Sequence, residues 1–247
     1  MRELPDVEVF CSYLGSTALH KRIADAEVSP PARMRNRPLH TLGHHLTPHR
    51  LEATDRHGNF VFVALKKRDC LVFHFGMTGF LRYFKEGDAP AHTLLLLHPA
   101  NGYRLAYAPP RKLGHVDPTN DPGDYVDVHD LGIDSLSVSE SQFRHLQRGR
   151  GRMKSWLMNQ RMISSLGNKY SDKFLFQAKL DPRSWHEDLT NRHWQTLYRR
   201  MRAVKETAIG APVDPARMHR AFPLPHRRER EQRPRCQRRI GERRQRH

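Results

Sequence analysis

The sequence predicts an α+β fold, in which an N-terminal helix and an antiparallel β-sandwich precede an all-α domain and a basic tail expected to be disordered. Three observations support this fold class. Short branched and aromatic segments separated by Gly, Asp and Pro turns fill residues 23–107, as in a sandwich. Apolar residues recur at helical spacing after Ser135. They almost vanish after Pro223, where the chain cannot bury enough surface to order itself.

The first domain is expected to span residues 1–130. Val7, Phe10 and Leu14 recur at helical spacing after a proline that is tolerated in a first turn, which predicts a helix over residues 5–19. The strands that follow are expected to include Phe60–Leu65, Cys70–Phe75, Phe80–Phe84 and Thr93–Leu97.

A loop-rich stretch over residues 108–130 is expected to connect this domain to a second one over residues 131–222, and residues 223–247 form the predicted tail. Ser137-Val138-Ser139-Glu140 has the spacing of a capping box and predicts the start of a helix. Further helical faces are expected from Trp156, Leu157, Met162 and Ile163, and over Asp172–Lys179 and Trp194–Val204.

The charge of the chain indicates an anionic partner. Its formal net charge is +17, of which residues 226–247, with ten Arg and three Glu, supply +7, so the remainder carries +10. Clustered Lys and Arg gain free energy by releasing counterions from a polyphosphate, which makes nucleic acid the leading partner class. A solvated basic face or a biased composition would give the same total.

Cysteine usage and hydropathy indicate where the chain resides. Cys11, Cys70 and Cys236 are odd in number and share no ligand or disulfide spacing, which favours a reducing compartment over secretion. The start is charged, unlike a signal peptide, and the longest purely apolar runs fall far short of the ~20 residues of a membrane span. We therefore expect a cytoplasmic protein with no membrane partner.

Several segments, in the expected order along nearly the whole chain, resemble the motifs of the formamidopyrimidine-DNA glycosylase and endonuclease VIII family. They include Met1-Arg2-Glu3-Leu4-Pro5-Asp6-Val7-Glu8, His74-Phe75-Gly76-Met77-Thr78-Gly79, Arg111-Lys112-Leu113-Gly114 and the block from Lys154 to Pro182. The resemblance implies a base-excision-repair enzyme that removes an oxidised purine and then cleaves the strand as an AP lyase. Its implied partner is double-stranded DNA containing an oxidised base or an abasic site, and its implied second domain is of the helix-two-turns-helix type. The resemblance also implies a monomer of bacterial type that is associated with the nucleoid.

The resemblance assigns Met77, Arg111 and Leu113 to a wedge that fills the gap left by an everted nucleotide. Extraction of a base costs a few kcal/mol of stacking and pairing, so the hole has to be refilled by apolar and stacking side chains. Leu113 can fill volume but cannot stack. Outside this context, Met77 would be interpreted as a core residue at a strand end.

The block from Lys154 to Pro182 is implied to bind the phosphate beside the lesion through Lys154 and Asn168. Gly167 would let the backbone approach that phosphate, and the following helix would present free N–H groups at its positive end. A Gly-Asn pair on its own more often marks only a turn.

The resemblance also defines three catalytic positions, two of which are substituted. Arg2 stands where the family has its nucleophilic proline, whereas Glu3 matches the carboxylate that assists proton transfer. In Arg56-His57-Gly58-Asn59-Phe60, Asn59 stands where the family places a catalytic lysine. Met1 is expected to remain before the bulky Arg2, which would displace the terminal amine by one residue.

Zinc and other cofactors are not expected. The family's four-cysteine zinc finger is matched by Cys236 alone, because Arg233 stands where the first cysteine belongs, and one thiolate cannot form a tetrahedral site. His44, His45 and His49 lie in a polar stretch without a paired carboxylate or cysteine, which argues against a metal site there as well.

Three functions stay open at this point. The first is an active glycosylase, and the second is a DNA-binding homologue whose catalysis is impaired by Arg2 and Asn59. The third is an RNA-binding protein, which is disfavoured because no spacing of aromatic residues suggests a stacking platform.

Overall fold

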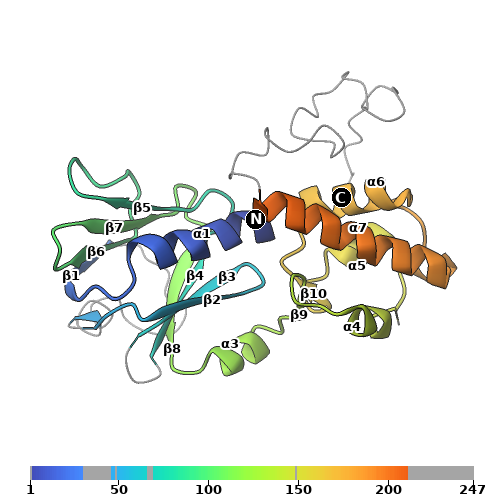
Figure 1. The fold of residues 1–247 in the computed structure, drawn as a ribbon, viewed down its shortest axis with the longest axis horizontal. Helices are drawn as coiled ribbons and strands as arrows, with labels where there is room; N and C mark the ends of the chain where they lie inside the picture. Colours follow the sequence, from blue (N-terminus) through green and yellow to red (C-terminus); the bar gives the residue numbers. More distant parts are fainter. Residues whose placement is uncertain (1, 30–45, 48, 66–68, 148, 211–247) are drawn as a thin grey trace, which may run out of the picture. The chain divides into compact units, whose positions relative to one another are not determined.

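The computed structural model describes residues 2–29, 46–47, 49–65, 69–147 and 149–210, whose contacts divide into two compact units (Figure 1). Of the described residues, those within 2–138 and 158–167 form the first unit, and those within 139–157 and 168–210 form the second. The predicted tail, with Arg233 and Cys236, lies outside the described residues, as do His44 and His45. Among the described residues, no helix is both long enough and apolar enough to cross a bilayer.

The first helix confirms the sequence prediction. Helix α1 spans Leu4–Thr17, with a proline in its first turn, and starts after Glu3, whose backbone is extended. Its buried face includes Val7 and Leu14, which are fully enclosed. Burial of this regular apolar stripe in the core stabilises the helix.

Two four-stranded antiparallel sheets follow, with strand orders β1-β6-β7-β5 and β2-β3-β4-β8. The strands of the first sheet are β1 Ile23–Val28, β5 Phe80–Phe84, β6 Leu95–Pro99 and β7 Arg104–Ala108. Those of the second are β2 Ala53–His57, β3 Phe60–Ala64, β4 Cys70–His74 and β8 His115–Thr119. Three of the four predicted strands are confirmed to within one residue, whereas the fourth, predicted over Thr93–Leu97, begins and ends two residues later.

The core of the first unit follows the alternation of side chains along these strands. Leu71 and Phe73 of β4 share one apolar cluster with α1 and with Leu105 of the other sheet. Val72, between them, joins a second cluster with Tyr125 on the opposite face. Because successive residues of a strand point to opposite faces, one short segment serves both clusters.

The prediction of a loop-rich connection over residues 108–130 is wrong, because this stretch contains strand β8 and helix α3, Pro122–Val128. Pro118 obscured the strand, but β8 lies at a sheet edge, where a missing N–H is tolerated. Asp121 caps α3, because its side chain accepts hydrogen bonds from the backbone N–H groups of Gly123 and Asp124.

The second unit is built from helices, as predicted. They are α4 Glu140–His145, α5 Met153–Leu157, α6 Asn168–Ala178, α7 Asn191–Gly210 and the short 3₁₀ helix η2 His186–Asp188. Trp156 lies at the centre of an aromatic cluster, with ring centroids 5.0 Å from Trp194 and 6.0 Å from Phe143. Edge-on packing of these large rings holds α4, α5 and α7 together.

Two local predictions in this region need correction. The capping box of α4 is formed by Ser139 and Gln142, two residues later than predicted. Ile163 is not helical but lies in strand β10, Ile163–Ser164, which pairs in parallel with β9, Ile133–Asp134. An apolar residue within a short segment does not by itself distinguish a helix from a buried strand.

Candidate nucleic-acid interface

The three wedge candidates lie together on two neighbouring loops of the first unit. Met77 follows β4, while Arg111 and Leu113 lie between β7 and β8. Met77 and Leu113 are 47% and 52% exposed, which is unusual for apolar side chains of this size and argues against a core role for Met77. Arg111 Nη1 donates to Met77 Sδ at 3.3 Å, so the structure brings all three positions to one exposed tip.

Glycines allow these two loops to interlock. Gly76 has a φ of +56°, and a Cβ there would lie 2.7 Å from the carbonyl carbon of Leu113. A Cβ on Gly114 would collide with Tyr107 Oη, whose hydroxyl donates to the carbonyl of His74 at 2.7 Å. Backbone therefore packs directly on backbone beneath the wedge, with no room for a side chain between the two loops.

The N-terminal segment is attached to the same turn. The backbone N–H of Arg2 donates to Gly76 O at 2.6 Å, and Arg2 Nε donates to Gly79 O at 3.3 Å. Arg2 Nη1 lies 3.5 Å from Asp6 Oδ2, and its guanidinium lies 5.7 Å from the ring centroid of Phe10. The side chain at the nucleophile position thus contacts both the wedge turn and helix α1.

Glu3 is buried beside Gly167 in the first unit. Its carboxylate is enclosed, with 7% of the residue exposed, and Glu3 Oε2 accepts a hydrogen bond from Gly167 N at 3.2 Å. A Cβ at position 167 would lie 2.6 Å from Glu3 Cδ. The sequence predicted that Gly167 makes room for a phosphate, whereas in the structure the group that fills this space is the Glu3 carboxylate.

Asn59 lies where the sequence predicts, in the hairpin between β2 and β3, directly after Gly58 with its φ of +59°. Asn59 is only 4% exposed to solvent. A neutral amide cannot supply the cation or amine of a lysine. The hairpin is therefore of the expected shape, and the chemical group at its turn differs.

A buried ionic network fixes this hairpin, and the sequence analysis missed it. Arg56 Nη2 donates to Asp134 Oδ1 at 2.8 Å, Arg56 Nε donates to Glu8 Oε2 at 2.7 Å, and Gly58 N donates to Asp134 Oδ2 at 2.8 Å. Burial by itself would raise the pKa of Asp134, but the hydrogen bonds and charge of Arg56 lower it. Burial would likewise lower the pKa of Arg56, and its two carboxylate partners raise it instead.

In the second unit, Lys154 lies on α5 and Asn168 is the exposed first residue of α6. Lys154 Nζ forms an ion pair with Asp172 Oδ1 at 2.8 Å, with both side chains about a quarter exposed at 24% and 23%. Asp172 belongs to the helix that Asn168 begins, so this pair links the two predicted phosphate ligands. The first turn of α6 supplies N–H groups beside Asn168.

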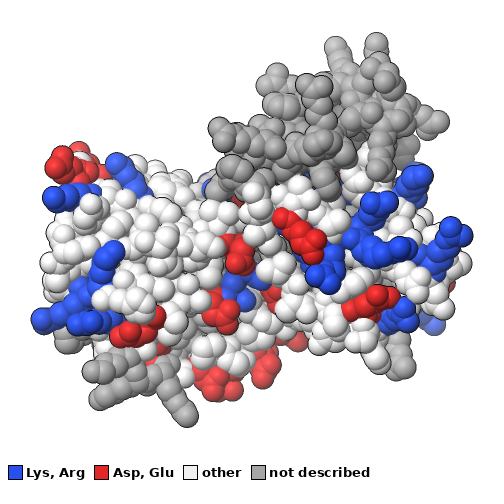
Figure 2. Space-filling model, in the orientation of Figure 1, with Lys and Arg blue, Asp and Glu red and all other residues white. Residues whose placement is uncertain are grey.

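Basic side chains also extend along the outside of α7. Arg192, Arg199, Arg200 and Arg202 are exposed there, and Figure 2 shows Lys and Arg side chains gathered over this helix. Such a surface attracts a polyanion without reading its sequence.

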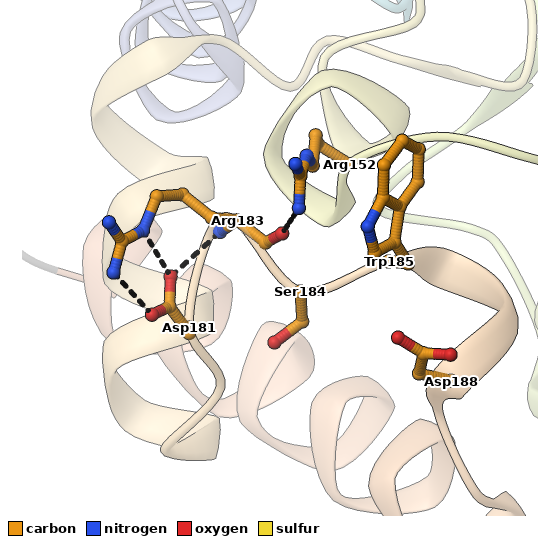
Figure 3. Close-up of a pocket in the computed structure, with 6 residues that line it drawn as sticks. All are labelled: Arg152, Asp181, Arg183, Ser184, Trp185 and Asp188. Carbon is orange, nitrogen blue, oxygen red and sulfur yellow. Dashed lines mark hydrogen bonds and ion pairs between the residues drawn. The ribbon is translucent and has the colours of Figure 1, made fainter.

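A separate hollow of about 400 Å³ lies in the second unit (Figure 3). Its lining comprises Arg152, Asp181, Arg183, Ser184, Trp185 and Asp188. The Arg152 guanidinium lies 4.0 Å from the ring centroid of Trp185, and Arg183 Nη2 pairs with Asp181 Oδ2 at 3.0 Å. Two arginines and two aspartates cancel in charge, so this hollow does not favour DNA, and none of the predicted site residues lies in it.

Metal ligands are not clustered in the part of the chain that the structure describes, where no group of three His, Cys, Asp or Glu residues could hold an ion. Cys11 and Cys70 are buried, and burial raises the pKa of both thiols, to about 11 for Cys70. Neither is poised to bind a metal as a thiolate.

Family models match both units. The N-terminal domain of formamidopyrimidine-DNA glycosylase matches residues 1–116, and the H2TH domain of the same protein matches residues 131–216. The chain belongs to the formamidopyrimidine-DNA glycosylase family. Relatives of that name from Thermus thermophilus and Pelotomaculum thermopropionicum are 32% and 29% identical over 215 residues, and each match covers 85% of this chain and 76% or 78% of the relative.

Solved glycosylase structures agree with this assignment. A complex of Lactococcus lactis Fpg with DNA containing an abasic site is 25% identical, with a TM-score of 0.78 over 84% of this chain and 78% of that chain. Another Lactococcus lactis complex reaches a TM-score of 0.87 over 97% and 93% of the two chains, at 23% identity, and supports the glycosylase fold.

Proposed function

We propose that the protein is a DNA-repair glycosylase that binds duplex DNA containing an oxidised base or an abasic site and everts the damaged nucleotide. The exposed tip formed by Met77, Arg111 and Leu113 carries this proposal. Exposed apolar side chains can enter the gap that an everted nucleotide leaves, and they offset part of the lost stacking. Relatives of the same family are described in complex with such DNA.

Lys154 and Asn168 would hold a phosphate of the damaged strand. The ammonium of Lys154 supplies charge, and the Asn168 amide and the first N–H groups of α6 supply hydrogen-bond donors. Asp172 keeps Lys154 oriented toward α6 before DNA arrives.

The family reaction would use Glu3 for proton transfer during base loss, and strand cleavage would follow. The buried position of Glu3 supports this role, because a carboxylate in a closed site can exchange a proton with the sugar without competition from water. We propose that the protein does not use the family's zinc finger, because Arg233 stands where the first of its four cysteines belongs.

A second candidate is binding and eversion without turnover. The observation that favours it is the environment of Arg2 and Asn59, where the first is hydrogen-bonded into the wedge turn and the second is a buried neutral amide. Neither supplies the neutral amine that attack on the sugar requires.

Borohydride trapping separates the two candidates. The full-length protein is incubated with duplex containing an abasic site or an oxidised guanine, with undamaged duplex and the Glu3→Gln variant as controls. A covalent adduct that survives denaturation supports the enzyme and excludes the binding-only candidate. Tight lesion-specific binding with neither an adduct nor a released base excludes the enzyme, and equal affinity for damaged and undamaged duplex overturns both.

A further inference from the structure

Arg2 reaches the wedge turn at both of its ends. Its backbone N–H donates to Gly76 O, just before Met77, and its Nε donates to Gly79 O, two residues after Met77. The two bonds span the four-residue turn that presents the methionine. From this geometry we infer that Arg2 is a positioning residue for the wedge, which braces the Met77 turn in place of acting as a nucleophile.

The guanidinium is also restrained from behind. Asp6 lies one helical turn away on α1 and faces Nη1 at 3.5 Å, and the Phe10 ring lies 5.7 Å from the guanidinium carbon. The side chain is 29% exposed. An arginine that binds phosphate usually offers its planar fork to the anion, whereas two edges of this fork are already directed at protein oxygens.

The two bonds from Arg2 act on the turn that bears the load when Met77 is inserted into DNA. Insertion of Met77 between stacked bases requires the bases to separate, and the opposing force acts on the turn that carries Met77. This turn contains Gly76, whose backbone is left-handed. Bonds to Gly76 O and Gly79 O oppose the opening of that turn. A proline in place of Arg2 has no side-chain donor and would leave Gly79 O without this partner.

This inference rests on the proposed eversion of a damaged nucleotide, and it makes Arg2 distinguishable from a phosphate ligand. A phosphate contact contributes about 0.9 to the slope of log K against log salt, whereas a brace contributes nothing to that slope. Loss of one charged hydrogen bond in the brace is expected to lower the everted population roughly tenfold.

The experiment compares the full-length protein with Arg2→Ala, Arg2→Lys and Arg82→Ala. Arg82 is an exposed arginine on β5 of the same unit and serves as a matched loss of charge. Each protein is titrated onto duplex that carries an abasic-site analogue opposite 2-aminopurine, whose fluorescence reports unstacking. Affinity is measured over a range of salt concentrations, and thermal melting establishes that each variant is folded.

Arg2→Ala is expected to lower the 2-aminopurine signal at saturating protein with an unchanged salt slope, and Arg82→Ala to leave the signal unchanged. Arg2→Lys is expected to behave like Arg2→Ala, since an ammonium lacks the Nε–H that meets Gly79 O. Combining Arg2→Ala with Met77→Ala should add nothing to Met77→Ala alone, because a brace acts through Met77.

A salt slope reduced by about 0.9 with a full signal at saturation would identify a phosphate ligand and overturn the inference. Additive effects of Arg2→Ala and Met77→Ala would overturn it as well. A native protein that binds no damaged duplex would refute the proposed function itself. If instead the native protein and Arg2→Ala evert the nucleotide equally well, only the inference about Arg2 is overturned.

Discussion

Single residues decide how closely the parts of the candidate site approach one another. Gly167 lies against the Glu3 carboxylate with no room for a side chain, and Gly76 lies against the Leu113 backbone in the same way. The sequence marked Gly167 as a point of close approach, whereas Gly76 stood only as a member of a motif. It did not reveal what approaches them, because that depends on contacts between residues far apart in the chain.

Gly167→Ala is expected to lower the free energy of unfolding by about 1–3 kcal/mol, since the added methyl overlaps Glu3. It should also abolish any Glu3-dependent strand cleavage. Urea denaturation and a nicking assay on damaged duplex measure the two effects. Gly210→Ala is the control, because no atom lies within 4 Å of the added Cβ there. Equal stability of the two variants would refute the close packing of Glu3 on Gly167.

Restoring the substituted groups tests the binding-only candidate. Arg2→Pro and Asn59→Lys are made singly and together, and mass spectrometry establishes whether Met1 is removed. The double variant is expected to give more borohydride-trapped adduct than the native protein, because it regains a secondary amine and a cation. If the double variant with a free proline gives no adduct, these two positions do not explain the loss of chemistry.

Elements of the first unit are joined by buried charges. Arg56 of β2 holds Glu8 of α1 and Asp134 of β9, and Asp134 in turn holds the Gly58 turn. Because the pKa of Asp134 is lowered in the folded protein, its carboxylate contributes stability above the ordinary Asp pKa of about 3.9. That contribution is lost as the pH falls through the lowered value.

Asp134→Asn should therefore cost about 3–5 kcal/mol at neutral pH, since it leaves Arg56 buried beside a neutral group. The difference from the native protein should begin to shrink as the pH falls below about 4, where Asp134 of the unfolded chain takes up a proton, and should disappear only below the lowered pKa of the folded protein. Urea denaturation between pH 7 and pH 3 gives both numbers. Asp181→Asn is the exposed control and should change stability little. A pH-independent difference would contradict the assignment to Asp134.

The α5–α6 pair of the second unit permits a test of the phosphate site. Lys154→Ala is expected to weaken binding of every duplex and to reduce the salt slope by about 0.9, the value for one lost phosphate contact. Asp172→Asn removes the ion-pair partner of Lys154 but leaves the positive charge of Lys154 in place, so the salt slope should stay unchanged. Fluorescence anisotropy at several salt concentrations distinguishes them. An unchanged slope for Lys154→Ala would remove it from the site.

Sequence patterns predicted most elements because their signals are local. The stripe of α1 and the short apolar runs of β3 and β4 can be recognised within a few residues. Strand β8 and helix α3 were missed because Pro, Asp and Gly turns dominate that stretch, and the strand is specified by its partner β4. The Arg56 network was missed for a similar reason, since an arginine shows its burial only when its carboxylates are assembled around it.

At the scale of the whole molecule, a net charge of +17 dictates strong salt dependence. Duplex DNA is expected to bind more tightly than single-stranded RNA of equal length at matched salt, because the exposed tip suits a stacked helix. Competition of the two against labelled damaged duplex measures the preference. An RNA that competes better than undamaged duplex would revive the RNA-binding function.

The interlocked backbones of Gly76 and Leu113 have a consequence for how lesions are found. A loop whose backbone packs this closely on a second backbone has little room to shift, so we expect most of the deformation on insertion to fall on the DNA. The rate at which each base pair opens should then follow the weakness of that pair. Base pairs weakened by damage would then open first, so the protein would detect the weakness of a pair before it contacts the damaged base itself.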